Sequence, residues 1–284
     1  MKIEDKNLII DTHAHLNFKD FEKDLDDIIE KNLKNNIWVI NAGSNYKTSK
    51  KSVEIANKYS KGVYSSVGFH PIHATRGFNK NEDDIFENEF DYDQYKKLAL
   101  SSNKVVAIGE TGLDYYYKPK NKSKLSEFKE KQKNVFIDHI KLSQEVKLPL
   151  ILHCRMAHQD LLEILKENEV RGVIHCYTGN WEDAQKYLEL GLYIGFTGVI
   201  FKKIDGIDFK DVIKKIPLNR ILIETDCPYL IPPQVINNYQ RNEPFLVKYI
   251  AQEIAQIKGI EVSELIKKTT ENAINLFNLK LDKR

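Results

Sequence analysis

Short apolar runs alternate with longer amphipathic stretches along the whole chain. The apolar runs are about five residues long and bounded by polar residues, which is typical of strands buried on both faces of a parallel sheet. Eight runs are predicted to be strands: Leu8–Leu16, Ile37–Gly43, Val63–His70, Val105–Glu110, Pro149–His153, Gly172–Cys176, Leu192–Thr197 and Arg220–Asp226. The amphipathic stretches are predicted to be helices: Phe21–Lys34, Ser123–Val146, Gln159–Glu167, Trp181–Leu190, Glu243–Lys258 and Val262–Leu276.

The order of these elements favours one fold class. A strand followed by a helix, repeated about eight times, indicates an α/β protein with a (β/α)8 TIM-like barrel, and residues 1–284 are expected to form a single domain. The alternative is an open, doubly wound sheet, which normally has a glycine-rich phosphate turn after its first strand. Here the first strand ends in Asp-Thr-His-Ala-His at 11–15, without glycine. Two polar stretches, Thr75–Asp93 and Lys118–Lys124, are predicted to be loops that can include short helical turns.

Composition and charge exclude several classes of protein. With 42% hydrophobic and 30% charged residues, the chain is neither collagen-like nor disordered. Its 43 Lys and Arg against 41 Asp and Glu give a net charge of +2, which argues against coating nucleic acid by bulk electrostatics but leaves a local basic groove open.

Three features bear on where the protein works. The charged segment Met1–Asn7 does not fit a signal peptide, and no apolar run reaches membrane-spanning length. Three cysteines do not suggest a disulfide framework. We therefore expect a cytoplasmic protein with reduced thiols and no membrane association.

Residue types that bind metals recur where the predicted strands end. His13 and His15 are two positions apart on a strand, so both side chains are expected on one face, taken to be the interior together with Ile9 and Asp11. Further candidates each follow a buried apolar run: Glu110, His153, His175 and Asp226. Barrel active sites lie at the carboxyl ends of strands, and buried imidazoles and carboxylates need partners, so these six residues are predicted to form a metal site. The alternative is a set of separately satisfied buried polar groups.

The number of candidate ligands indicates more than one ion. Four imidazoles and two carboxylates are too many for one tetrahedral zinc, and they suit two divalent ions with Glu110 as a bridge. Two such ions can clamp a phosphoryl oxygen and lower the pKa of a bound water, which then acts as the nucleophile. Asp226 could accept the proton of that water, so Asp226 and Glu110 are the predicted catalytic residues.

Four further polar residues are placed beside this site. Arg155 lies two positions after His153 and could hold a phosphate through two hydrogen bonds, although a surface ion pair fits its position equally well. His70 ends the third predicted strand and is a candidate for substrate binding. Asp114 and Glu224 could orient a ligand imidazole through its second nitrogen, with a buried ion pair as the alternative for Glu224.

The cysteines and tyrosines near the site have simpler interpretations. Cys154, Cys176 and Cys227 each directly follow a proposed ligand, so strand alternation turns them away from the metals and predicts small buried hydrophobic residues. The run Tyr115–Tyr117 could stack on bases of a single strand or pack against the protein. The lysine-rich stretch Lys118–Lys133 fits a phosphate-binding track or a solvated helix face.

Eight short motifs are spread over nearly the whole chain. They are Asp11–Leu16 (DTHAHL), Val67–Pro71 (VGFHP), Gly109–Tyr115 (GETGLDY), His153–Arg155 (HCR), His175–Gly179 (HCYTG), Glu224–Leu230 (ETDCPYL), Arg241–Pro244 (RNEP) and Thr270–Asn272 (TEN). Together and in this order, they resemble the TatD family of metal-dependent deoxyribonucleases, within the amidohydrolase-like barrels.

The resemblance implies a TIM-like barrel and a two-metal site with the six ligands named above. It also implies hydrolysis of DNA phosphodiester bonds with Mg, Mn or Zn, often as exonuclease action on single strands, in a cytoplasmic protein without an obligate protein partner. One loop departs from the family. Where Tyr-Arg-Gly-Lys usually precedes Arg241, this chain has Ile236–Gln240 without a basic residue, so the phosphate contacts of that loop are open. The two polar loops also look longer than usual.

The sequence therefore predicts a metal-dependent hydrolase that cleaves DNA, with a single strand as the expected substrate. The same metal pair could instead hydrolyse an ester or amide such as D-aminoacyl-tRNA, because barrels of this kind host many chemistries. A third hypothesis is a nucleic-acid-binding scaffold stabilised by metal. The complete ligand set argues against it, since a scaffold needs no open double-metal site.

Overall fold

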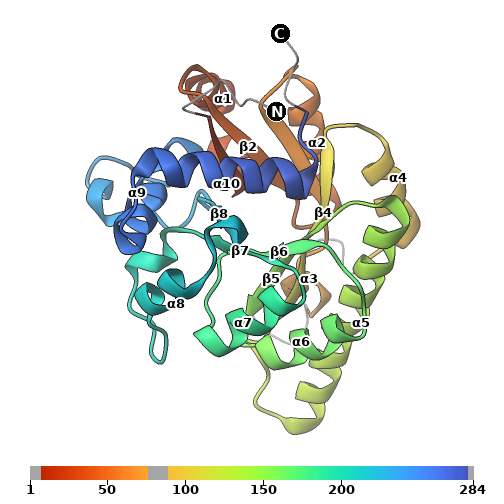
Figure 1. The fold of residues 1–284 in the computed structure, drawn as a ribbon. Coiled ribbons are helices and arrows are strands. Elements are labelled where there is room, and N and C mark those ends of the chain that lie inside the picture. The colour runs from red at the N-terminus through yellow and green to blue at the C-terminus, as the bar shows by residue number, and fades with distance from the viewer. Residues whose placement is uncertain (1–7, 76–88, 281–284) are drawn as a thin grey trace.

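The computed structural model describes residues 8–75 and 89–280, and its centre is a sheet of eight parallel strands in sequence order. The strands are β1 (Ile9–Ala14), β2 (Ile37–Ala42), β3 (Val63–Val67), β4 (Val105–Asp114), β5 (Leu150–Arg155), β6 (Gly172–Ile174), β7 (Tyr193–Phe196) and β8 (Ile221–Ile223). The sheet closes beyond β8, where the N–H groups of Asp226 and His15 donate to the carbonyls of His13 and Cys227, each at 2.9 Å. The predicted TIM-like barrel is confirmed (Figure 1).

Helices surround the strands (Figure 1). They are α1 (Leu25–Lys34), α2 (Tyr46–Asn57), α3 (Pro71–Ala74), α4 (Tyr92–Leu100), α5 (Lys122–Val146), α6 (His158–Lys166), α7 (Trp181–Glu189), α8 (Phe209–Lys215), α9 (Val247–Lys258) and α10 (Val262–Phe277). The predicted helices do not include α2, α3, α4 or α8. For α2 the reason is a buried face that includes Ser49 and Ser52 and is therefore partly polar. Within the described ranges, no helix is long and apolar enough to cross a membrane.

The two stretches expected to be loops with short helical turns contain the first residues of two longer helices. α5 begins inside Lys118–Lys124, because the Asn121 side chain accepts the N–H groups of the two residues after Lys122 and so caps the helix. The end of Thr75–Asp93 belongs to α4, which the Asp91 side chain caps in the same way. Residues 76–88 and the segment Met1–Asn7 lie outside the described residues, so those expectations remain predictions.

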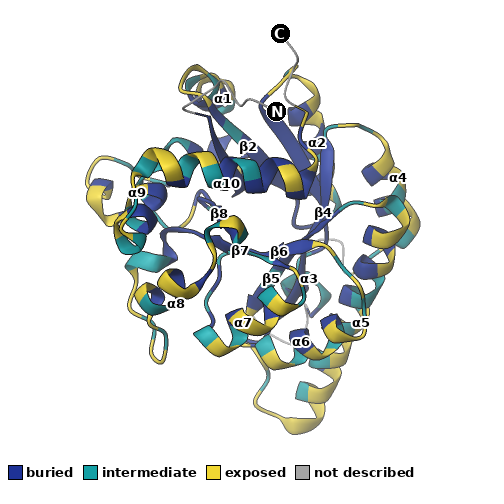
Figure 2. Ribbon diagram, in the orientation of Figure 1, coloured by how far each residue is buried: buried dark blue, intermediate teal, exposed yellow. Residues whose placement is uncertain are grey.

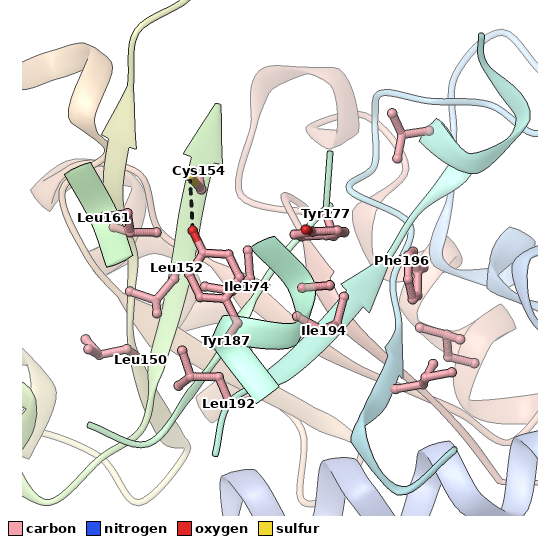
Figure 3. Close-up of a cluster of buried hydrophobic side chains, with 14 of the residues drawn as sticks. Leu150, Leu152, Cys154, Leu161, Ile174, Tyr177, Tyr187, Leu192, Ile194 and Phe196 are labelled. Atoms are coloured by element: carbon pink, nitrogen blue, oxygen red, sulfur yellow. Dashed lines mark hydrogen bonds between the residues drawn. The ribbon is translucent and has the colours of Figure 1, made fainter. Parts of the chain in front are cut away.

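An outer apolar layer holds the helices against the strands. Leu152 of β5 and Ile174 of β6 pack in this layer with Tyr187 of α7, and Cys154 Sγ contacts the Tyr187 hydroxyl at 3.7 Å (Figure 3). Figure 2 shows the strands buried and the outward faces of the helices exposed. Cys154 and Cys227 are buried and Cys176 is half-buried, all three as free thiols.

A second apolar cluster fills the amino-terminal half of the barrel interior. It takes residues from β1, β2, β4, β5, β6 and β8: Ile10, Ile40, Val106, Ile151, Val173 and Leu222. α10 closes this end, because its Phe277 packs into the cluster and its Thr270 hydroxyl donates to the Leu8 carbonyl at 2.6 Å. The polar residues that follow the cluster along the strands therefore occupy the opposite, carboxyl end.

The expectation that Ile9 and Asp11 face the interior is wrong. Ile10 lies in the interior cluster, whereas Ile9 packs in the outer layer. Thr12 also points inward, and its hydroxyl donates to Glu224 at 3.1 Å. The pairing of β1 with β2 shifts register between Asp11 and Ala14. This irregularity changes the facing of the residues after Thr12, and so permits His13 to reach the interior.

Candidate metal centre

Six side chains predicted to bind metal meet at the carboxyl end of the barrel. His13, Glu110 and His153 lie within β1, β4 and β5, while the other three follow the ends of β1, β6 and β8: His15, His175 and Asp226. They form groups of three whose possible ligand atoms lie within 4.8 Å of one another. Five segments far apart in the sequence therefore place their side chains in one cluster, as parallel strands of a barrel do.

Glu110 lies inside its strand, not at the strand end where the apolar run stops. β4 continues to Asp114, and its pairing with β5 shifts register between Ile108 and Thr111. Gly109 lies within this shift and Gly112 follows it, with φ of +145° and +134°. A Cβ on Gly112 would lie 2.1 Å from the carbonyl oxygen of His153. Glycine is thus required for β4 and β5 to approach closely on either side of Glu110.

The two carboxylate oxygens of Glu110 face two different pairs of histidines. Oε2 lies 3.4 Å from His13 Nε2 and 3.5 Å from His15 Nε2. Oε1 lies 2.9 Å from His153 Nδ1 and 2.8 Å from His175 Nε2. Glu110 therefore stands between two groups of ligands.

Asp226 belongs to the first of these groups. Its Oδ1 lies 3.7 Å from His13 Nε2 and 3.4 Å from His15 Nε2. The cluster is open on one side, because the Asp226 and His153 side chains are 17% and 16% exposed while that of His13 is 0% exposed. Solvent, and hence a substrate, can approach the cluster from Asp226 and His153.

Outer hydrogen bonds decide which nitrogen of two histidines points to the centre. His15 Nδ1 lies 3.1 Å from the Ala42 carbonyl, which can only accept, so a neutral His15 presents an unprotonated Nε2 to the cluster. His153 Nε2 lies 3.0 Å from Asp114 Oδ2, which leaves Nδ1 as the ligand atom of His153. Asp114 thus lies where a residue that orients an imidazole is expected.

Within each group, two ring nitrogens are as close as hydrogen-bond partners. His13 Nε2 and His15 Nε2 are 3.1 Å apart, and His153 Nδ1 and His175 Nε2 are 3.2 Å apart. Two unprotonated nitrogens at this distance repel each other unless a proton or a cation lies between them. Imidazole nitrogen with carboxylate oxygen is a donor set typical of divalent transition metals. The residues present therefore fit a divalent cation in each group.

Burial and neighbouring charges shift the pKa values of the cluster. Burial alone would raise the pKa of the Glu110 carboxyl, but His70, His175 and His13 lower it well below its ordinary value. Burial lowers the pKa of His13 to about 4. For His153, Asp114 and Glu110 outweigh the effect of burial and raise the pKa to about 9. Glu110 and His13 are therefore in the forms that bind metal at neutral pH, whereas metal binding at His153 would release a proton.

His70 lies beside the cluster, and its hydrogen bonds distinguish it from the six. Its Nδ1 accepts the N–H of Ile72 at 3.1 Å, so a neutral His70 carries its proton on Nε2. That Nε2 lies 3.3 Å from Glu110 Oε1, and the His70 ring packs edge-on against His153. His70 is therefore placed to donate a hydrogen bond into the site.

Glu224 has closer partners than an imidazole. Its carboxylate accepts the N–H of Cys176 at 3.0 Å and the hydroxyl of Thr12 at 3.1 Å, whereas His175 Nδ1 lies 3.9 Å away. Through these two hydrogen bonds, Glu224, which directly follows β8, is linked to β1 and to the segment after β6. Glu224 thus connects three elements beneath the cluster and lies beyond hydrogen-bond distance of His175.

Arg155 and Arg241, both at this end of the barrel, have different partners. The exposed Arg155 guanidinium stacks on the ring of Tyr116, with Cζ 3.6 Å from the ring centre, and forms no ion pair with a described residue. Arg241 bonds to the carbonyl of Asp20 and the carboxylate of Asp24. Arg241 therefore ties the loop after β8 to the segment after β1.

Two buried polar residues that hold the cluster in place were not singled out by the sequence pattern. The Asp11 carboxylate accepts the Thr225 hydroxyl at 2.5 Å and the Thr225 N–H at 2.9 Å. The Asn242 side chain donates to the carbonyls of Thr225 and Tyr229 at 3.0 and 2.6 Å. Asp11 thus fixes Thr225, the residue before Asp226, and Asn242 fixes the backbone on both sides of Asp226. Asp11 lies in DTHAHL and Asn242 in RNEP, so the motifs marked their positions without indicating this role.

Known proteins resemble this chain over nearly its entire length. The sequence matches the family described as "TatD related DNase" over residues 10–278. The uncharacterized metal-dependent hydrolase YabD of Bacillus subtilis is 38% identical over 277 residues, which are 96% of this chain and 100% of YabD. The "3'-5' ssDNA/RNA exonuclease TatD" of Escherichia fergusonii is 29% identical, covering 95% of this chain and 99% of that protein. The crystal structure of YJJV, a TatD homologue from Escherichia coli K12, is similar with a TM-score of 0.80 and 25% identity, over 97% of this chain and 100% of YJJV.

Proposed function

Because the chain belongs to the TatD-related DNase family of metal-dependent hydrolases, we propose that it cleaves phosphodiester bonds of DNA, acting as an exonuclease on single strands. The observation that carries this proposal is the position of Glu110 between two groups of histidines at an open end of the barrel. The proposed catalytic unit is residues 1–284 as one hydrolase domain.

We assign two divalent ions, Mg, Mn or Zn, to the two groups of ligands. His13, His15 and Asp226 with Glu110 Oε2 would hold one ion, and His153 and His175 with Glu110 Oε1 would hold the other. Such a pair supplies Lewis-acid stabilisation of a phosphoryl oxygen and an activated water. Asp114 keeps His153 Nδ1 directed at the centre through the bond to Nε2.

Asp226 is the proposed proton acceptor. It is the more exposed of the two clustered carboxylates, at 17% against 5% for the Glu110 side chain. Its carboxylate can therefore meet a water that attacks from the open side and take its proton. His70 donates from Nε2 on the same side, next to His153, and is placed to bind an oxygen of the scissile phosphate.

Exposed aromatic residues at this end of the barrel support a single-stranded substrate. Tyr116 and Tyr117 follow β4 and Tyr229 follows β8, and their exposed fractions are 49%, 53% and 55%. Tyr115, in contrast, is buried and donates to Asp160, so only the last two residues of that run can stack on bases. Arg155 on the face of Tyr116 adds a cation that a backbone phosphate can reach.

The test is digestion of end-labelled single-stranded DNA by metal-stripped protein, with Mg, Mn or Zn added back. We expect metal-restored shortening from one end in the wild type and its loss in Asp226→Asn. Asp205→Asn, in an exposed loop, is the matched control and should retain activity. Activity that survives Asp226→Asn would reveal a contaminating nuclease or a wrong proton acceptor. No cleavage with any metal would overturn the nuclease proposal, and ester and amide substrates would be tested next.

A further inference from the structure

A cavity of about 690 Å³ lies at the amino-terminal end of the barrel, opposite the metal centre. It is lined by the starts of strands, such as Val105 of β4 and Gly172 of β6, and by Phe277 at the end of α10. α10 is bonded to the other side of the barrel, where Asn272 Nδ2 donates to the Ile221 carbonyl at 2.8 Å. The helix thus closes the barrel near β1 and β8, and the cavity, called here the basal cavity, lies beside it.

The charge in the basal cavity is of one sign. Six cations line it, and none of its described lining residues is Asp or Glu: Lys61, Lys104, Lys147, Arg171, Arg220 and Lys280. The whole chain has a net charge of only +2, so these cations are a local concentration that the overall composition does not explain. A concave basic surface of this kind attracts anions.

The two arginines are held in place by neutral groups. Arg171 Nη2 donates to the Leu276 carbonyl at 2.8 Å, and Arg220 Nη1 donates to the Gly191 carbonyl at 2.9 Å. Arg220 also lies over the Tyr193 ring, 5.1 Å from its centre. These contacts orient each guanidinium without neutralising its charge. Since a guanidinium has five donors, N–H groups remain for a ligand.

Three further lysines that line the cavity come from separate segments. Lys61 precedes β3, Lys147 follows α5, and Lys280 follows α10. All three are exposed, and none forms a salt bridge with any residue in the described part of the chain. Bringing like charges together without carboxylates is unfavourable unless an anion neutralises them.

We propose that the basal cavity binds a small phosphate-bearing anion of nucleotide size. Its volume falls within the range of about 300–1,000 Å³ that is usual for small-ligand sites. The guanidinium groups match phosphate oxygens in geometry, and Tyr193, Asn275 and Asn278 offer a ring and amides to an organic part. This inference does not depend on the proposed nuclease function.

The test is calorimetric titration of the full chain with inorganic pyrophosphate and, separately, with ADP at low salt. Lys61→Gln/Lys147→Gln/Lys280→Gln should weaken binding by about tenfold or more, because it removes half of the local charge. The matched control Lys23→Gln/Lys141→Gln/Lys267→Gln removes the same charge from exposed positions elsewhere and should bind as the wild type does. Tighter binding of ADP than of pyrophosphate would place the nucleoside in the cavity as well, and equal affinity would assign the site to phosphate alone.

Further measurements separate the basal cavity from the metal centre and from a nucleic-acid surface. His153→Ala/His175→Ala should retain the binding, and its loss there would place the anion at the metal centre. Equal binding by both lysine variants, or no binding of either anion, would overturn the proposal. The proposal would also be overturned if a single-stranded DNA 20-mer bound in a way that depends on the three lysines while neither small anion bound. Thermal unfolding tests whether each variant is folded. If a triple variant does not fold, its three single substitutions are compared with the three single control substitutions, and the former should weaken binding more.

Discussion

The two ends of the barrel hold their charged side chains in opposite ways. At the carboxyl end, Glu110 and Asp226 lie among histidines at 2.8–3.7 Å. At the amino end, Arg171 and Arg220 bond to backbone carbonyls, and no carboxylate lines the basal cavity among the described residues. The carboxyl end therefore holds side chains that can bind cations, whereas the amino end holds cationic side chains. One scaffold therefore carries both proposed sites, which have opposite charge preferences.

The largest effect should come from removing the charge that joins the two groups of ligands. Glu110→Gln leaves the shape of the side chain but supplies a neutral group to both pairs of histidines. We expect metal-dependent hydrolysis of DNA to fall on the order of 10³-fold, because both ions lose a shared anionic ligand. Initial rates at saturating metal measure the loss.

The same variant should keep its fold. Glu110 is 4% exposed, and Gln has the same size and can still form hydrogen bonds, so the packing around position 110 is retained. The lost attraction to His70, His175 and His13 is partly offset by the lower cost of burying a neutral group. An unfolding midpoint close to that of the wild type, together with lost activity, would show that Glu110 serves the reaction and is not needed for folding. Full activity of folded Glu110→Gln would disprove the bridging role.

A substitution at the amino-terminal end of the barrel should lower the stability of the protein without changing the rate of hydrolysis. Phe277 of α10 is 2% exposed and packs in the interior cluster, so Phe277→Ala should lower the free energy of unfolding by about 3–5 kcal/mol. Urea unfolding measures this loss, and the rate per folded molecule should not change. Leu100→Ala, at a position 64% exposed, is the control and should have little effect. A loss well under 1 kcal/mol for Phe277→Ala would show that α10 does not plug the barrel.

A smaller effect is expected for the residue that orients a ligand. Asp114→Asn weakens the bond to His153 Nε2, so metal affinity should fall by about 10–100-fold. Metal titration followed by activity gives the apparent affinity. Asp160→Asn alters a nearby carboxylate that bonds to Tyr115 and Lys129, and it should leave the affinity unchanged. The same loss in both variants would point to a general electrostatic effect.

The smallest expected change concerns the aromatic rim of the carboxyl end. Tyr116→Ala removes a stacking surface and the support of Arg155, so KM for single-stranded DNA should rise by about tenfold with kcat nearly unchanged. Steady-state kinetics with the wild type and with Tyr249→Ala on α9 provide the comparison. A rise in KM that is equal for the two variants would argue against base stacking at Tyr116.

The sequence predicted the barrel and the meeting of the six site residues for a physical reason. Glu110, His153 and His175 each follow residues that must be buried, and side chains of their type are costly to bury unless they share partners. Parallel strands bring such positions to one end. The roles of the six as metal ligands remain proposals, which rest on the distances among them.

The finer geometry depends on features that side-chain patterns do not encode. The pairing of β1 with β2 shifts register after Asp11, and β4 extends beyond Glu110 with a register shift of its own. Strict alternation of side chains between the two faces of a strand, counted from Ile9, therefore does not predict which side chains face the interior. The division of the ligands into two groups depends on which oxygen of Glu110 faces each histidine. The basal cavity was also not visible in the sequence, because its cations come from loops separated by many residues.

The most direct test of the two-group account is the number of ions bound. Metal-stripped protein is dialysed against Mn²⁺, and bound manganese is measured by atomic spectroscopy together with the protein concentration. We predict two ions per chain in the wild type, and one in each of the double variants His13→Ala/His15→Ala and His153→Ala/His175→Ala. One ion or none in the wild type, or two ions in both double variants, would contradict the assignment of this cluster as a two-metal centre.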